Sequence, residues 1–185
     1  SADVVKLAIR AARTSGREVG PLVEQLRKAA GLSETPPALT AEQRTKLLAD
    51  VMAQGDPSRG EEVYRRAELN CQKCHGIGGA GGLVGPDLAS IGASAPADYI
   101  LESMLDPGAK IKENYHSQIV ATDEGQVLTG ILLRETNDAL ILRDAEDREL
   151  SIPLDSIEER KDGGSLMPAG LLNELTRQET LDLLR

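Results

Sequence analysis

The sequence predicts a mainly helical protein that carries a small antiparallel β insertion and an additional group of helices at its N-terminal end. Apolar residues recur at helical spacing over residues 1–54 and again from residue 57 onwards. From about residue 115 to residue 162 the period changes to two, and turn residues separate the runs. A single Cys-x-x-Cys-His sequence, Cys71 to His75, lies in the second helical region, before the β insertion.

Residues 1–54 are expected to form three helices that serve packing. The first would end at Gly16, and the second would run from Pro21 to Gly31. Residues 33–39 contain two prolines and are predicted to form a linker. The third helix begins after the N-cap residue Thr40, and Gln43 completes a capping box. The predicted apolar stripe of the first helix is Val4, Leu7, Ala8 and Ala11, and that of the third is Leu47, Leu48, Val51 and Met52.

A fourth helix is expected to start at Asp56-Pro57 and to run into the cysteine motif. Gly60 on this helix would let another helix cross closely, and we expect that helix to be the last one, with Leu181 and Leu184. The stretch from Gly76 to Gly85 is rich in glycine and is predicted to be a loop. A further helix should follow Pro96 and stop at Asp106-Pro107.

Short runs with period two predict one compact antiparallel β unit over residues 115–162. Its strands should include residues 119–122, 127–133, 139–142 and 149–152, with a fifth candidate at 157–160. We expect Val127, Ile131 and Leu133 to be buried, with Leu140 or Leu142 opposite them. The pattern loosely resembles SH3-like or Sm-like barrels.

The C-terminal residues predict a loop around Met167-Pro168 and then two helical pieces. The first piece covers residues 171–175. The last helix begins after Thr176, and Glu179 lies in the capping-box position.

Cys71 and Cys74, followed directly by His75, form the signature of covalent c-type haem attachment. On one helical turn the two sulfur atoms are about as far apart as the two vinyl groups of a haem, and the imidazole can then bind the iron. The chain has 2 Cys and 2 His, so a four-ligand zinc site lacks a second ligand pair. A thioredoxin-like dithiol is the other alternative, but no βαβ pattern accompanies it.

Composition limits the remaining function classes. The net charge of −9 argues against nucleic acid as a partner, because binding to phosphates requires a positive field. No run approaches the roughly 18 apolar residues of a membrane-spanning helix, and we expect no membrane span. With 3 Tyr and neither Phe nor Trp, the core should be mostly aliphatic.

The chain resembles a class I cytochrome c in five features taken together. These are the helix with Gly60 and Tyr64, the cysteine motif, the Gly85-Pro86 loop, the Met167-Pro168 loop and the closing Leu-rich helix. The long interval between His75 and Met167 makes the chain most similar to the planctomycete-type haem-binding domain, over about residues 56–185. The resemblance implies one covalent haem c with Cys71 and Cys74 as attachment sites, His75 as proximal ligand and Met167 as distal ligand. It also implies that Pro86 packs on the haem and that its carbonyl group orients the proximal histidine.

The expected fold is therefore a mainly α cytochrome c fold with a small antiparallel β insertion and an N-terminal helical extension. The expected limits are 1–54 for the extension and 55–185 for the cytochrome domain, interrupted by 115–162. Met167 is favoured over Met52 and Met104, which fall on helical stripes where methionine usually fills a core. His116 is the alternative distal ligand and would give a bis-histidine haem.

Two filled axial positions favour electron transfer by a non-enzymatic carrier. The resemblance implies a periplasmic or other extracytoplasmic location, and redox partner proteins such as a dehydrogenase or another cytochrome. Two other functions stay open. An open or labile distal site would make the chain a haem sensor or a peroxidase-like enzyme, and the β insertion could instead be the working surface of a binding module.

Overall fold

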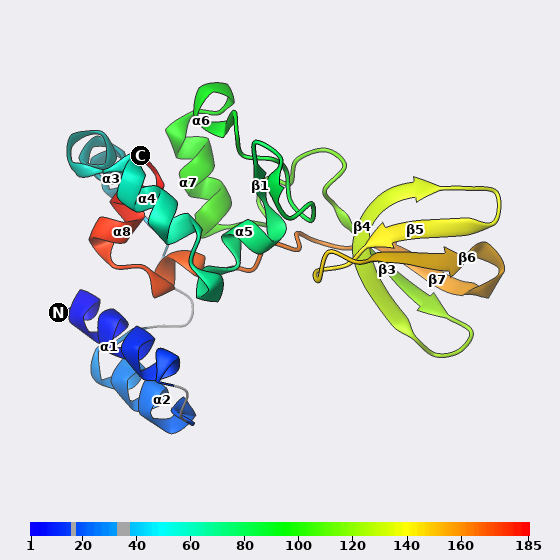
Figure 1. Cartoon of the computed structure of the whole chain (residues 1–185), viewed down its shortest axis with the longest axis horizontal. Helices are drawn as coiled ribbons and strands as arrows, with labels where there is room; N and C mark the ends of the chain where they lie inside the picture. Colours follow the sequence, from blue (N-terminus) through cyan, green and yellow to red (C-terminus); the bar gives the residue numbers. More distant parts are fainter. Residues whose placement is uncertain (16–17, 33–37) are drawn as a thin grey trace. The chain divides into compact units, whose positions relative to one another are not determined.

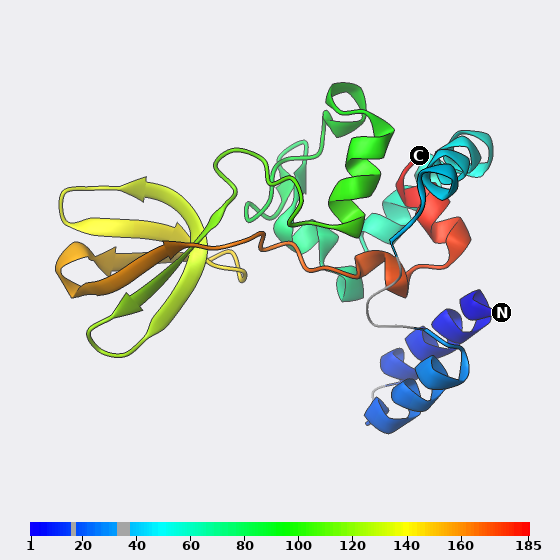
Figure 2. The same cartoon turned by 180° about the vertical axis from the view of Figure 1, so that it is seen from behind.

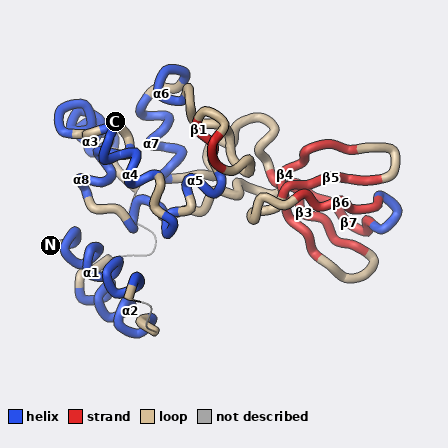
Figure 3. Tube along the Cα trace, viewed as in Figure 1, coloured by secondary structure: helices blue, strands red, loops and turns tan. Residues whose placement is uncertain are grey.

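A computed structural model describes residues 1–15, 18–32 and 38–185. The chain divides into two compact units. Residues 1–64 and 170–185 form what we call the helical unit, and residues 65–169 form the central unit. Figure 1 shows the elements of both, and Figure 3 separates their helices from their strands. Helices and an antiparallel sheet are both substantial parts of the structure, so the fold is mixed rather than mainly α.

The helical unit contains α1 (Ala2–Thr14), α2 (Gly20–Ala29), α3 (Ala41–Gln54), α4 (Pro57–Tyr64), the 3-10 turn η3 (Leu171–Glu174) and α8 (Arg177–Leu183). Both predicted capping boxes are present. Thr40 and Gln43 exchange hydrogen bonds at the start of α3, as do Thr176 and Glu179 at the start of α8. These helix starts were predictable because a capping box involves residues only three positions apart.

The predicted apolar stripe of α1 is wrong. Val4 is 63% exposed and Leu7 is exposed as well, whereas Ile9 is buried. The neighbouring face of α1 packs inward, and on it the Lys6 ammonium donates to the carbonyl oxygen of Leu175 at 2.6 Å. The proposed end of this helix at Gly16 and most of the 33–39 linker lie outside the described residues.

The expected close crossing of α4 with the last helix is confirmed. Gly60 is buried and lies against the main chain of Asp182 in α8, while Tyr64 and Leu181 are buried in the same unit. Asp56 is the N-cap of α4, since its carboxylate accepts from the N–H groups of Ser58 and Arg59 at 2.9 and 3.1 Å. The helix ends at Tyr64, however, and does not run into the cysteine motif.

In the central unit, the chain passes from the 3-10 turn η1 (Ala67–Leu69) to α5 (Cys71–Cys74) and then to a minimal hairpin of β1 (Gly76–Ile77) and β2 (Ala80–Gly81). The expectation of a plain loop from Gly76 to Gly85 therefore needs correction. Gly78 and Gly79 both have positive φ, which a two-residue hairpin turn of this kind requires. The short helix α6 (Ile91–Ser94) and α7 (Ala97–Leu105) follow, and Leu101 of α7 is buried.

The predicted β unit is confirmed as a five-stranded antiparallel sheet (Figures 2 and 3). Its strands are β3 (Ser117–Thr122), β4 (Val127–Glu135), β5 (Ala139–Arg143), β6 (Glu149–Pro153) and β7 (Ile157–Asp162), in the order β6-β5-β4-β3-β7. The fifth strand thus returns beside the first, after the 3-10 turn η2 (Leu154–Ser156).

The buried face of β4 differs from the prediction. Val127 is 69% exposed and Leu133 is also exposed, so the assignment of both to the core was wrong, whereas Ile131 is buried. The sheet core consists of Val120, Leu140, Leu142 and Ile152, with Leu128, Leu132, Leu150, Leu154 and Ile157 packed against it. Strand β4 has apolar residues on both faces. The core face is the one with Leu128 and Leu132, which lie opposite Val120 of β3 and Leu142 of β5.

Candidate functional site

Cys71 and Cys74 begin and end α5, which is a single helical turn. The preceding residue, Asn70, has a left-handed backbone with φ 56°, and this sets α5 apart from η1. The N–H group of His75 donates to the carbonyl oxygen of Cys71 at 2.8 Å and closes the turn. Both cysteines are half-buried free thiols. The turn thus presents two thiols and an imidazole from five consecutive residues.

The imidazole of His75 is held by the main chain of Pro86. Its Nδ1 atom lies 2.8 Å from the Pro86 carbonyl oxygen. A carbonyl oxygen can only accept, so Nδ1 carries a proton, and in the neutral ring Nε2 is then the nitrogen with the lone pair. A neutral imidazole fixed by such an outer hydrogen bond is the form that binds a metal ion through its second nitrogen.

Glycines let the loop after the hairpin pack directly on the motif. A Cβ atom at Gly85 would lie 2.4 Å from Cε1 of His75, so only glycine leaves room for the ring. A Cβ atom at Gly82 would lie 1.7 Å from the carbonyl oxygen of Lys73. The N–H groups of these glycines donate to the carbonyl oxygens of Gln72 and Cys74, at 2.9 Å for Gly82 and 2.7 Å for Gly85. Residues 82–86 therefore hold both the cysteine turn and the histidine ring.

The electrostatic surroundings of the thiols argue against a redox-active dithiol. Burial raises the pKa of the Cys71 thiol, and the same effect raises the pKa of Cys74. The carboxylates of Asp147 and Glu146 add to the increase at Cys74. A thioredoxin-like nucleophile requires a lowered pKa, because the thiolate is the reactive form.

Met167 belongs to the same unit and lies in a segment without regular structure. It is half-buried, and its N–H group donates to Oγ of Ser165 at 3.1 Å. The segment is anchored to the start of the sheet, since Oγ of Ser117 donates to the carbonyl oxygen of Gly164 at 2.8 Å and the Gly163 N–H donates to the Ser117 carbonyl oxygen at 2.7 Å. A Cβ at Gly163 would lie 2.2 Å from the Ser117 Oγ, so a larger residue would displace this hydroxyl group.

The other three candidates for a distal ligand have different environments. Met104 is half-buried on α7. His116 is exposed, directly before β3. Met52 is 64% exposed on α3, so its expected role as core filler is wrong. The structure thus brings Cys71, Cys74, His75 and Pro86 together, and it places Met167 in a separate segment of the same unit.

One residue near the site was missed by sequence reasoning. Asp147, in the turn between β5 and β6, accepts a hydrogen bond from the Leu83 N–H group through Oδ2 at 3.2 Å. Its Oδ1 atom pairs with Arg143 at 2.8 Å. In the sequence Asp147 is one of several acidic residues of a polar turn, and nothing local marks it as a contact of the motif loop.

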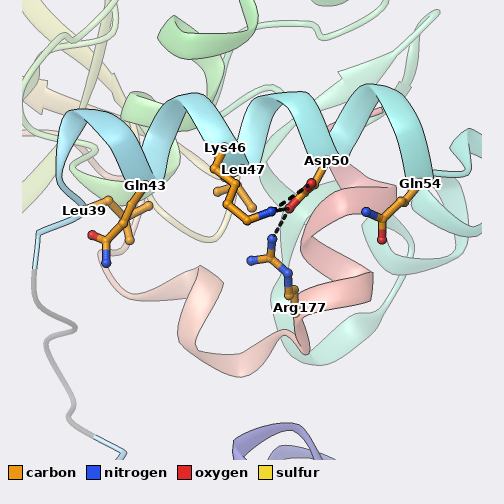
Figure 4. Close-up of a pocket in the computed structure, with 7 residues that line it drawn as sticks. All are labelled: Leu39, Gln43, Lys46, Leu47, Asp50, Gln54 and Arg177. Atoms are coloured by element: carbon orange, nitrogen blue, oxygen red, sulfur yellow. Dashed lines mark hydrogen bonds and ion pairs between the residues drawn. The ribbon is translucent and has the colours of Figure 1, made fainter.

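A surface pocket lies elsewhere, on the helical unit (Figure 4). It is lined mainly by α3, from Gln43 to Gln54, together with Leu39 and Arg177. Lys46 pairs with Asp50 at 3.0 Å, and Arg177 pairs with the same carboxylate. The Lys46 pair lies within α3, whereas the Arg177 pair joins α3 to α8. We assign the pocket no chemistry.

Residues 57–146 match the family model described as cytochrome c. This segment is a cytochrome c domain. It includes Cys71, Cys74, His75 and Pro86, and it ends before Met167. The comparison with curated proteins found no match.

The chemistry of a cytochrome c domain fits the residues that the structure places together. Cytochrome c domains carry a covalently bound haem c and are typically electron carriers rather than enzymes, with other redox proteins as partners. Two thiols on one turn and an imidazole held through Nδ1 are the kinds of group that a covalently bound haem requires. Cytochromes of the c type are generally extracytoplasmic. In the described part of the chain, none of the helices is long and apolar enough to cross a membrane.

Proposed function

We propose that this cytochrome c domain is a monohaem electron carrier, with the haem attached through Cys71 and Cys74 and the iron bound by His75. The observation that carries this proposal is the hydrogen bond between His75 Nδ1 and the Pro86 carbonyl, with Gly85 against the ring. This arrangement fixes the histidine in the tautomer that an axial ligand requires. When bound, the haem supplies a one-electron Fe(III)/Fe(II) couple.

The residues of the site have separate roles in this proposal. Cys71 and Cys74 would hold the haem covalently. Addition of each S–H bond across a vinyl group would form a carbon–sulfur bond and place the hydrogen on the other vinyl carbon, with no oxidant consumed. Pro86 keeps a proton on Nδ1 of His75, so that Nε2 would be the nitrogen that binds the iron. Gly82 and Gly85 let the loop approach closely enough for that contact.

We further propose Met167 as the distal ligand. Its segment is anchored at Gly163 and Gly164 to the start of the sheet, and Pro168 restricts Met167 towards an extended backbone. A thioether is a soft, neutral ligand and raises the reduction potential. The exposed His116, directly before Ser117 of the same anchor, is the alternative.

We place the chain in the planctomycete-type subgroup, with the cytochrome domain over residues 55–185, and the protein in the periplasm or an equivalent compartment. Its redox partner would be a dehydrogenase or another cytochrome. The β insertion supports this view because its strands occupy residues 117–162, inside the interval between His75 and Met167.

The test is covalent haem content after maturation in an oxidising compartment with a cytochrome c assembly system. Intact mass under denaturing conditions should show one retained haem, and the pyridine haemochrome spectrum should show two saturated vinyl groups. A Cys71→Ala variant should retain a haem with one unsaturated vinyl group or lose it. A haem-free mass for the unmodified protein would overturn the proposal, and CO binding by the unmodified ferrous protein would favour the sensor or peroxidase-like alternative.

A further inference from the structure

The turn between β5 and β6 contacts the loop that holds the histidine. Asp147 in this turn has φ 66°, and its carboxylate bridges two parts of the central unit. Oδ2 accepts from the Leu83 N–H group, and Oδ1 pairs with Arg143 of β5. Arg143 also pairs with Glu149 of β6 at 3.1 Å. The side chain of Arg143 is only 12% exposed, so its position is set by the sheet. Through this pair the sheet fixes the carboxylate of Asp147.

The path from Leu83 to the histidine is short and tightly packed. Val84 is buried, and the next residue, Gly85, lies against the ring of His75. Pro86 follows and provides the carbonyl oxygen for Nδ1. A displacement of Leu83 would therefore move the two residues that set the position and hydrogen bond of the ring.

We propose that Asp147 is a positioning residue for His75, through which the β unit sets the position of the loop that carries Gly85 and Pro86. The insertion thereby influences the strength of the His75–Pro86 hydrogen bond and the reduction potential of the bound haem. The effect on the reduction potential rests on the proposed function. The link from Asp147 through Leu83 to the histidine loop concerns only residues of this chain.

Two variants of Asp147 separate the effect of its hydrogen bond to Leu83 from the effect of its charge. Asp147→Ala removes the charge and the acceptor, whereas Asp147→Asn removes the charge and keeps an acceptor oxygen for the Leu83 N–H group. Asp138→Asn is the matched control, because Asp138 lies in the turn at the other end of β5 and its exposed carboxylate carries the same charge.

We expect Leu83 amide exchange to become faster by roughly tenfold in Asp147→Ala, the factor that corresponds to one lost hydrogen bond. Exchange in Asp147→Asn and Asp138→Asn should stay close to that of the unmodified protein. The signal of the His75 Nδ1–H proton in the reduced protein should shift in Asp147→Ala and return towards its normal position in Asp147→Asn. The reduction potentials of the Ala and Asn variants should differ, since both have lost the charge and only one has lost the hydrogen bond.

Equal Leu83 exchange and equal His75 signals in the Ala and Asn variants would overturn the inference. The same change in Asp138→Asn would also overturn it, because the effect would then be one of charge alone. If the Ala variant fails to fold, the Asn variant must keep the Leu83 exchange rate of the unmodified protein, and a faster rate there counts against the role of Asp147. A failure of the proposed function would be recognised separately, by absence of covalent haem from the unmodified protein, and amide exchange can then be compared in the haem-free proteins.

Discussion

Gly60 of α4 lies directly against the main-chain carbonyl group of Asp182 of α8. A Cβ atom at position 60 would stand 2.1 Å from that oxygen. The side chain of Asp182 is buried and accepts hydrogen bonds from the Asp56 N–H group at 2.9 Å and from Nε of Arg59 at 2.8 Å. The two helices are thus joined by a close main-chain approach and by a buried carboxylate.

Gly60→Ala should destabilise the protein by at least about 1 kcal/mol, because overpacking against a main-chain oxygen exceeds the gain in helix propensity. The denaturation midpoint in urea measures this effect. Gly92→Ala on α6 is the matched control, since a Cβ there would meet no atom within 4 Å, and its midpoint should stay the same or rise. Equal midpoints for the two variants would show that the α4–α8 crossing is looser than described.

Asp182 should make stability depend on pH in the acid range. The hydrogen bond from Arg59 lowers the pKa of this carboxyl from 3.8 to about 2. Its contribution is therefore present above a pH of about 4 and is lost as the pH falls towards 2. Asp182→Asn should destabilise by roughly 1.5–3 kcal/mol at pH 7, as expected for hydrogen bonds to a charged group. The difference from the unmodified protein should shrink between pH 4 and pH 2, whereas the exposed Glu24→Gln should show no comparable loss at pH 7.

Gly85→Ala should impair the binding of haem. Its Cβ would lie 2.4 Å from the ring of His75 and displace either the ring or the loop. The fraction of protein with covalent haem, measured by intact mass, should fall several-fold. Gly164→Ala provides the control, because a Cβ at Gly164 meets no atom within 4 Å. A normal haem content in Gly85→Ala would contradict the close packing of the loop on the histidine.

Met167→Ala should open the sixth position of the iron. We expect a lower reduction potential and a ferrous form that binds CO, because a soft ligand would be replaced by water or by nothing. His116→Ala and Met52→Ala should cause neither change. If the Met167 variant stays inert to CO while the His116 variant binds it, the haem is ligated by two histidines and the electron-transfer proposal needs a different distal ligand.

Glu174→Gln should loosen the packing of α1 and α2 on the C-terminal segment. Glu174 pairs with Arg13 at 2.8 Å and also with Arg27. Since both pairs are partly exposed, the loss should be about 1 kcal/mol and should shrink at high salt. Amide exchange of Ile9 and Val23 measures it, and Glu42→Gln on α3 is the control. Unchanged exchange at low salt would mean that apolar contacts alone hold these helices.

Local features of the fold could be predicted from the sequence. The two capping boxes and the strand limits depend on neighbouring residues, so their signals are complete within a few positions. The cysteine motif is local for the same reason. The faces of α1 and β4 were predicted wrongly, because each element has apolar residues on two sides and the choice depends on distant partners such as Leu175 and Val120.

The contacts that shape the candidate site are mostly long-range and were harder to predict. Gly85 could be assigned to a loop, but its approach to the ring of His75 becomes visible only in three dimensions. Asp147 lies 64 residues from Leu83, and neither residue has a sequence signal for the other. The buried carboxylate of Asp182 was missed because an acidic residue in a terminal helix normally faces water.

The contacts between Ser117 and residues 163–164 have a consequence for the evolution and engineering of this chain. The sheet starts and finishes at nearly the same place, so its residues add no length to the path between the flanking segments. A segment with adjoining ends can be exchanged for another folded unit, or for a tight turn, at a small cost in chain entropy. A version in which a short Gly-Ser bridge joins residues 116 and 165 would therefore be a natural starting point for a minimal form of this chain.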